Sequence, residues 1–178
     1  MTTYRSFISI PHTVTLSKHQ GCLFLHGPLG SLCLNLHDMD PFAWNSLCID
    51  LDGGTVRIES LKKSSHGLIH SMIVNAFHGV THGFLVYLKL VGIGYRVSLD
   101  QETLVFKLGY AHDILYKIPQ GVKIFVNDPT LFCVFGIDKN QVTQIARTLR
   151  DLRKPSVYKG KGIRFLDEHI PLKSGKRK

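Results

Sequence analysis

A chain of 178 residues with 44% hydrophobic and 20% charged residues has the composition of an ordinary globular protein, which excludes global disorder. Its apolar runs, such as Phe84 to Leu88, fall far short of the roughly 20 residues that cross a bilayer, so no membrane partner is expected. The formal net charge is +9, and the excess lies in one half: residues 1–82 hold five Lys or Arg and five Asp or Glu, whereas residues 83–178 hold 17 and 8. A polyanionic partner explains this polarisation better than a solubility surplus, which needs no such asymmetry.

The four cysteines, Cys22, Cys33, Cys48 and Cys133, include no close pair at the spacing of metal ligands. Cys33 and Cys133 fall in apolar, strand-like runs, where a free cysteine behaves as a small hydrophobic residue. We therefore expect reduced, buried thiols and a reducing compartment. The first seven residues contain one cation and no apolar core segment, so a secretory signal is not expected.

Residues 1–82 predict a first α+β module. Ser46 to Ile58 has the alternation of a hairpin that turns at Gly53-Gly54. A helix follows, for which Ser64 or Ser65 is the expected N-cap, and Gly79 and Gly83 mark its exit. Its inner face is predicted to carry Leu68, Ile69, Met72, Ile73, Ala76, Phe77 and Val80.

Residues 83–178 predict a second module. A strand with alternating apolar residues from Phe84 to Leu90 is followed by Gly92 and Gly94, which permit a sharp bend. Further strands are predicted at about 103–108, 113–118, 122–127 and 131–136, and a helix begins at about Asp138. Its apolar face is predicted to carry Val142, Ile145, Ala146, Leu149 and Leu152, and its basic face Arg147, Arg150 and Lys154, before Pro155 ends the helix.

The two modules read as a diverged tandem repeat. Phe24-Leu25-His26-Gly27 aligns with Phe106-Lys107-Leu108-Gly109, and in each half later strands lead into one amphipathic helix. The predicted fold class is therefore α+β, with two tandem modules (1–82 and 83–178), each a small antiparallel sheet packed with one main helix. A basic loop and tail follow at the C-terminus.

The segment from Lys154 to Arg164 interleaves cations with small residues and one aromatic residue. Glycine allows close backbone approach to a surface, lysines supply charges for phosphates, and the Tyr158 ring can stack on a base or sugar. Residues 147–178 carry eleven cations and three acids, a density that predicts salt-sensitive binding to nucleic acid. The alternative is a solvated helix face followed by a disordered tail.

Catalytic and metal chemistry find little support in the sequence. His66/His70 and His78/His82 have helical i, i+4 spacing, but no acid or cysteine stands beside them at ligand spacing. Gly92-Ile93-Gly94 lacks the third glycine and the βαβ context of a dinucleotide site. We expect no enzyme activity, no metal and no cofactor.

Several stretches together resemble one known family. Tyr158-Lys159-Gly160-Lys161-Gly162-Ile163-Arg164 is similar to the signature of the sixth protein of the large ribosomal subunit, of bacterial and organellar type. Leu90 to Arg96, Leu108-Gly109-Tyr110-Ala111-His112, Ile118 to Gly121 and Gly136 to Lys139 follow in the order of that family. The likeness is strong over about 85–170 and weaker in the first module, where residues 71–84 carry it.

The resemblance implies a structural protein that arose by internal duplication and binds large-subunit rRNA mainly through its second module. It implies a position near the sarcin–ricin loop, where translational GTPases dock, beside neighbouring large-subunit proteins. Position by position, it assigns the RNA-contacting loop to Tyr158, Lys159, Gly160, Lys161, Gly162 and Arg164. It assigns supporting contacts to Arg150, Arg153 and Lys154, and contacts of the tail to Lys173, Lys176, Arg177 and Lys178.

Two features depart from the family pattern. Ser156 follows the signature proline where an acidic residue is usual, and the first module is rich in Cys, His and Phe. The second departure favours a mitochondrial ribosome over a plastid ribosome or a bacterial cytoplasm, and it suggests proteins as partners of the first module. Two alternatives to a ribosomal role are a free RNA-binding regulator and a metal-dependent enzyme built on the histidines.

Overall fold

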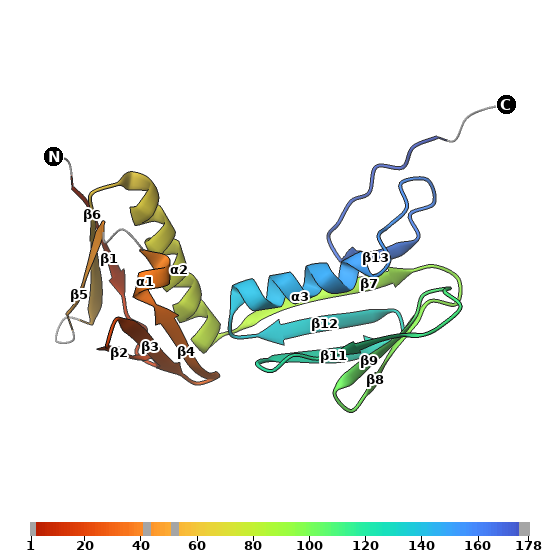
Figure 1. The fold of residues 1–178 in the computed structure, drawn as a ribbon, viewed down its shortest axis with the longest axis horizontal. Helices are drawn as coiled ribbons and strands as arrows, with labels where there is room; N and C mark the ends of the chain where they lie inside the picture. Colours follow the sequence, from red (N-terminus) through yellow and green to blue (C-terminus); the bar gives the residue numbers. More distant parts are fainter. Residues whose placement is uncertain (1–2, 41–43, 51–53, 175–178) are drawn as a thin grey trace. The chain divides into compact units, whose positions relative to one another are not determined.

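The computed structural model describes residues 3–40, 44–50 and 54–174, and these form two compact units (Figure 1). The first unit comprises Met1–Gly83 with Ile137–Lys139, and the second comprises Phe84–Gly136 with Asn140–Lys178. Each unit has its own buried apolar cluster. Antiparallel sheets and one main helix in each half confirm the predicted α+β class, although the described residues of each unit form two sheets where one was expected. The tandem repeat itself stays a prediction.

In the first unit, one sheet has the strand order β1-β6-β5 and the other the order β2-β3-β4. The strands are β1 (Tyr4–Ser9), β2 (Thr15–His19), β3 (Cys22–Gly27), β4 (Gly30–Asn35), β5 (Asn45–Asp50) and β6 (Thr55–Ser60). The short helix α1 spans Leu36–Met39, and α2 spans Lys63–Thr81. The antiparallel pairing of β5 with β6 confirms the predicted hairpin, whose Gly53 lies outside the described residues.

Helix α2 buries Ile69, Ile73, Ala76, Phe77 and Val80 as predicted, and Met72 is partly buried. The prediction that Leu68 lies on the inner face is wrong, because its side chain is 52% exposed.

The ends of α2 also differ from the prediction. Among the residues that the structure describes, no side chain caps its N-terminus, where Lys62 is the N-cap residue. The buried Ser60 shapes this entry instead, because its Oγ donates to the Lys62 carbonyl (2.9 Å) and accepts from the Lys62 N–H (3.2 Å). Gly79 lies inside the helix, and only Gly83, at φ +76°, follows its end.

In the second unit, a four-stranded sheet has the order β11-β12-β7-β13 and a three-stranded sheet has the order β10-β9-β8. The strands are β7 (Phe84–Val91), β8 (Arg96–Asp100), β9 (Thr103–Lys107), β10 (Ile114–Lys117), β11 (Val122–Asp128), β12 (Leu131–Gly136) and β13 (Gly162–Phe165), and α3 spans Lys139–Asp151. The strands before α3 confirm the sequence prediction. Strand β13 was not predicted, because its residues were assigned to a loop.

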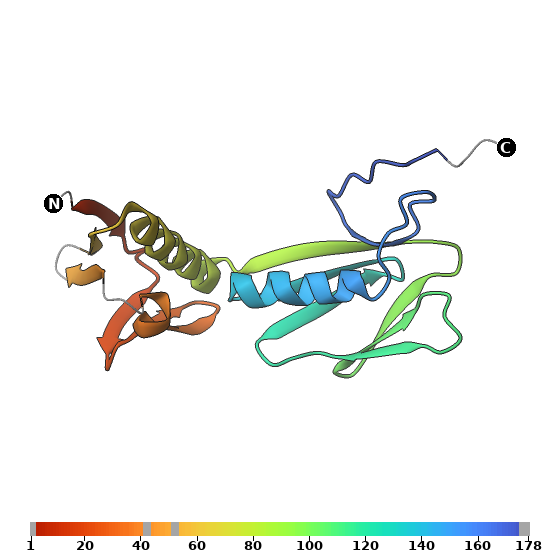
Figure 2. The same cartoon turned by 45° about the horizontal axis from the view of Figure 1, so that its top comes forward.

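Helix α3 covers one face of the four-stranded sheet (Figures 1 and 2), and its apolar residues pack in the same buried cluster as residues of that sheet. Val142, Ala146 and Leu149 are fully buried against residues such as Leu88 and Phe132 of the sheet. The arrangement leaves the C-terminal end of α3 beside the edge formed by β13. The segment between them therefore begins and ends on rigid elements.

Candidate nucleic-acid interface

The basic loop, residues 154–161, is a turn closed by its own backbone hydrogen bonds. The Ser156 N–H donates to the Lys161 carbonyl (2.9 Å), and the Gly160 N–H donates to the Ser156 carbonyl (2.7 Å). The Tyr158 N–H donates to the Ser156 Oγ at 3.3 Å. Because these bonds hold the turn, its side chains are available to a partner.

The side chains at the tip of this loop point into solvent. Tyr158 is 61% exposed, and Lys159 and Lys161 are exposed beside it. Lys154 is also exposed and lies 3.8 Å from a carboxylate oxygen of Asp151, an ion pair that solvent screens strongly. Two cations and an aromatic ring on one rigid turn match the chemistry of phosphates and bases.

The two glycines of the loop have different structural roles. Gly160 has φ +65°, a conformation that favours glycine, and it is partly exposed. Gly162 is buried, and a Cβ on it would lie 2.6 Å from Cα of Pro155 and 2.8 Å from the Arg153 carbonyl oxygen. The close approach that the sequence suggested for RNA is thus, at Gly162, an approach to the chain's own backbone.

Strand β13 fixes the C-terminal side of the loop. Its residues pair with β7, so that Arg164 lies opposite Lys89, and the Ile163 N–H donates to the Arg153 carbonyl (2.8 Å). Arg164 is half-buried on this strand rather than on the loop. Its like-charged cross-strand neighbour makes an anionic partner favourable there.

Arg150 is held by a protein carboxylate. Its Nε donates to Oε2 of Glu168 at 3.0 Å and its Nη2 to Oε1 of the same side chain, and the guanidinium lies 5.8 Å from the Phe165 ring centroid. The hydrogen bonds with Glu168 raise the pKa of Arg150 and lower the pKa of Glu168. This pair ties α3 to the segment after β13, so Arg150 supports the interface through the fold.

Arg153 stacks on Tyr110, with its guanidinium carbon 4.5 Å from the ring centroid. The Tyr110 hydroxyl donates to the Leu152 carbonyl at 3.1 Å, which fixes the ring against the end of α3. Interaction with Tyr110 also raises the pKa of Arg153. Its stacked position keeps a permanent positive charge beside the loop.

The start of the C-terminal tail lies along the basic loop. The Lys173 N–H donates to the Val157 carbonyl (2.9 Å), and Lys173 is exposed. The loop and the chain after β13 both project beyond α3, on the side of the sheet that the helix covers (Figures 1 and 2). Lys176, Arg177 and Lys178 lie outside the described residues.

The sequence did not identify two residues that support the candidate site, Tyr110 and Glu168. Tyr110 stands in the Gly-aromatic-small-His turn that carries part of the family resemblance, which was a usable signal. Glu168 gave no signal, because an acid in a basic stretch does not reveal which cation it pairs with.

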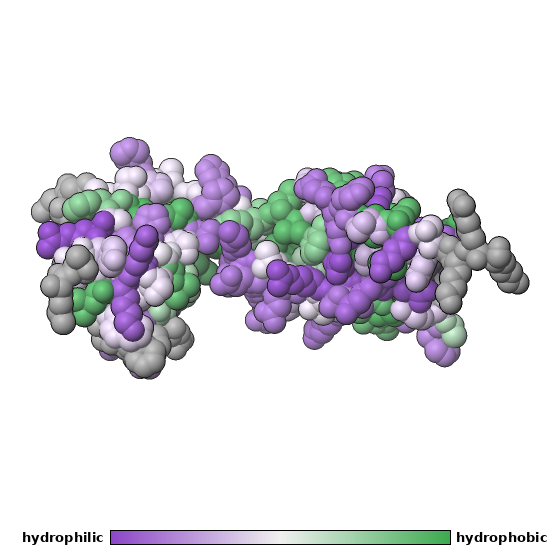
Figure 3. All heavy atoms as spheres, turned by 90° about the horizontal axis from the view of Figure 1, so that it is seen from above, coloured by the Kyte–Doolittle hydropathy of each residue, from purple (hydrophilic) through white to green (hydrophobic). Residues whose placement is uncertain are grey.

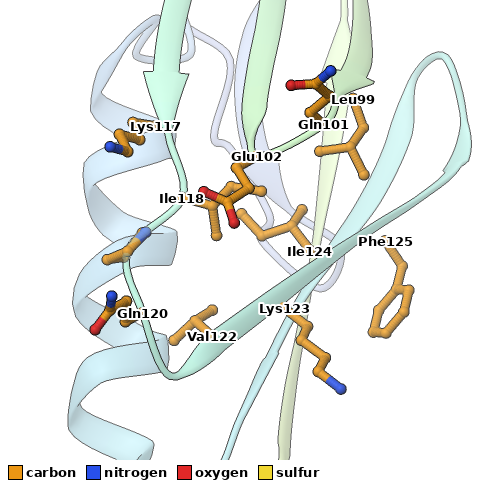
Figure 4. A pocket seen from close by; sticks show the side chains of 11 residues that line it. Leu99, Gln101, Glu102, Lys117, Ile118, Gln120, Val122, Lys123, Ile124 and Phe125 are labelled. Atoms are coloured by element: carbon orange, nitrogen blue, oxygen red, sulfur yellow. The ribbon is translucent and has the colours of Figure 1, made fainter.

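The remaining surface offers weaker candidates. The rings of His66 and His70 lie 6.3 Å apart and those of His78 and His82 5.3 Å apart, but the described residues contain no group of three or more potential metal ligands. A groove of about 730 Å³ runs between β8, β10 and β11, with Lys117, Glu102 and Lys123 around an apolar floor (Figure 4). No described helix is long and apolar enough to span a membrane.

Hydrophilic side chains gather over the α3 side of the second unit, as Figure 3 shows from above. The basic loop and Lys173 belong to this unit. The exposed cations that the structure describes there agree with the uneven distribution of charge along the chain.

Comparison with known proteins gives a consistent result. The family described as Ribosomal protein L6 matches residues 91–165. The chain is 46% identical over 163 residues to large ribosomal subunit protein uL6m of Prototheca wickerhamii, covering 85% of this chain and 84% of that protein. It is 36% identical over 176 residues to large ribosomal subunit protein uL6 of Rhodopseudomonas palustris (strain HaA2), covering 96% of each. These relatives confirm the expectation that the chain is not an enzyme. The chain belongs to the ribosomal protein L6 family.

Proposed function

We propose that this protein is a structural constituent of the large ribosomal subunit and binds large-subunit rRNA through its second unit. The observation that carries the proposal is the basic loop, whose backbone is closed on itself while Tyr158, Lys159 and Lys161 project into solvent. A rigid cationic turn of this kind can bind and position RNA without catalysing a reaction. Family membership supports the same role, since the relatives are named as large-subunit proteins.

The proposed interface has three parts with different roles. Tyr158, Lys159, Gly160, Lys161 and Lys154 form the contacting loop, and Arg153 and Arg164 flank it. Arg150 and Gly162 shape the loop from within the fold, because one is paired with Glu168 and the other is packed on Pro155. Lys173 begins the tail, and Lys176, Arg177 and Lys178 are proposed to follow the RNA beyond it.

The proposed position is near the sarcin–ricin loop, where translational GTPases dock, with neighbouring large-subunit proteins as further partners. The resemblance to the family supports this location. The proposed compartment is the mitochondrial ribosome, supported by the 46% identity to a protein named uL6m and by the Cys, His and Phe content of the first module.

Isolation of ribosomes from cells that carry a tagged copy of the full chain tests the proposal. We expect the tagged chain to sediment with mitochondrial large subunits at one copy per particle. Ultraviolet crosslinking should join the peptide that contains Tyr158 to rRNA beside the sarcin–ricin loop. Recovery of the chain free of subunits, or in RNA complexes outside the ribosome, would support the regulator alternative and overturn the proposal.

A further inference from the structure

The hairpin of β3 and β4 brings two cysteines together that are eleven positions apart in the sequence. In the register of this pair, Cys22 lies opposite Asn35 and Phe24 lies opposite Cys33, so the two cysteines are diagonal neighbours. Leu23 and Leu25, which alternate with Cys22, are buried in the core of the first unit. Cys22 and Cys33 therefore share the opposite, outward face of the hairpin.

Both thiols are accessible and close to each other. Cys33 is exposed and Cys22 is half-buried, which corrects the expectation that Cys33 is a buried hydrophobic residue. Partial desolvation, followed by a hydrogen bond with Cys22, raises the pKa of Cys33. The strand register carries the geometry, because it makes the two side chains diagonal neighbours on one face of the hairpin.

The diagonal geometry favours a bridging ion over a disulfide. Diagonal neighbours in an antiparallel pair have Cα atoms roughly 7–8 Å apart, whereas a disulfide usually requires about 4.4–6.8 Å. Two metal–sulfur bonds of about 2.3 Å can join sulfur atoms up to about 4.6 Å apart, a much wider separation than the roughly 2 Å of a disulfide bond.

The ligand set also selects the kind of ion. Within the described part of the chain, no group of three or more His, Cys, Asp or Glu gathers here, so the three or four protein ligands of a zinc site are not assembled. Cu(I) prefers soft thiolates and is stable with two of them.

We propose that Cys22 and Cys33 form a two-thiolate site that binds one Cu(I) ion per chain. On binding, both S–H groups lose their protons to the buffer and two S–Cu(I) bonds form, with no change in oxidation state. The site lies in the first unit and is independent of the proposed RNA interface.

Anaerobic competition between the full-length chain and a chromogenic Cu(I) chelator tests this site. We expect the native chain to take one Cu(I) per monomer and to develop a sulfur-to-copper charge-transfer band in the near ultraviolet. Cys22→Ser and Cys33→Ser should each weaken Cu(I) binding by more than the roughly 10–100-fold that loss of an outer-shell partner costs, because only one thiolate ligand remains. Cys133→Ala, which changes a buried cysteine of the second unit, should bind Cu(I) like the native chain.

Circular dichroism of each variant checks that the fold is retained, and Ser on an outward face should preserve it. Binding that survives in the Cys22→Ser/Cys33→Ser double variant would overturn the proposal, as would an ion shared between two chains in native mass spectrometry. Because two protons leave on binding, apparent affinity should rise by up to about 100-fold per pH unit below the thiol pKa values. An affinity independent of pH would contradict coordination by two thiolates.

Discussion

Arg150 shows how a cation in a segment proposed to bind nucleic acid can also stabilise the fold. Its bond to Glu168 joins α3 to the chain after β13, and Glu168 also accepts from the Phe165 N–H at 3.2 Å. The side chains of Arg150 and Glu168 are 27% and 21% exposed, so solvent screens the pair only in part. We infer that this pair sets the position of the neighbouring basic loop.

Replacement of Glu168 by Gln tests this role through stability and pH. At pH 7 we expect a loss of about 1–2 kcal/mol in the free energy of unfolding, toward the low end of the roughly 1.5–3 kcal/mol of hydrogen bonds to charged groups, because solvent screens the pair in part. The bond with Arg150 lowers the pKa of Glu168 from its ordinary value of 4.5. Its contribution is therefore complete above pH 4.5 and is lost as pH falls through the lowered pKa, so the difference between the two chains should shrink in acid.

Denaturant unfolding of both chains at pH 7 and at about pH 3 provides the measurement. Asp151→Asn is the matched control, because its carboxylate is 53% exposed and lies 3.8 Å from Arg150 Nη1. The control should change stability by less than about 0.5 kcal/mol. If Glu168→Gln and Asp151→Asn lose equal free energies of unfolding, the inference that Glu168 has a special role is contradicted.

At the scale of elements, the loop depends on a strand edge and on the end of a helix. Gly162 allows β13 to pack directly on Pro155, where a Cβ would lie 2.7 Å from the Pro155 nitrogen, and its φ is +148°. Gly67 offers the opposite case inside α2, where a Cβ would meet nothing within 4 Å. Replacing each glycine by alanine should therefore change the free energy of unfolding in opposite directions.

We expect Gly162→Ala to destabilise the second unit by about 2 kcal/mol or more, through strain and overpacking. Gly67→Ala should stabilise the first unit by roughly 0.5–1 kcal/mol, because alanine has the better helix propensity. Native-state hydrogen exchange reports each unit separately, through amides of β7 and of α2. Unchanged exchange in β7 of Gly162→Ala would show that the packing on Pro155 is dispensable.

The regular elements of this fold were predictable because their apolar periodicity is strong. The alternation in β7 and the helical spacing of Val142, Ile145, Ala146 and Leu149 state which face is buried. Strand β13 was not predictable in this way, since four residues in a basic stretch become a strand only by pairing with β7, more than 70 positions earlier. The Cys22/Cys33 pair was missed for the same reason, because its closeness depends on hairpin register.

The candidate site was predictable as a segment but not as an arrangement. Charge density and glycine spacing identified the basic loop, and the structure describes Tyr158, Lys159 and Lys161 as exposed. A sequence pattern does not indicate which cation a given carboxylate will pair with in the folded protein. Arg150 therefore could not be separated from the contacting lysines in advance.

At the scale of the whole molecule, the uneven distribution of charge and the two structural units divide the chain at nearly the same residue. The first unit has a core of its own and no net charge over residues 1–82, whereas the excess of cations lies in residues 83–178. Salt-dependent affinity should thus come from the second unit, with each phosphate contact contributing a counterion.

The most direct test of this account is a salt titration of the full chain binding to large-subunit rRNA. The Lys159→Ala/Lys161→Ala variant is compared with the native chain and with Lys117→Ala/Lys123→Ala, which removes two exposed lysines that line the groove of the same unit. We predict weaker binding by the loop variant and a slope of log affinity against log salt that is shallower by about one to two. The groove variant should match the native chain. An unchanged slope and affinity for the loop variant would contradict the proposed interface.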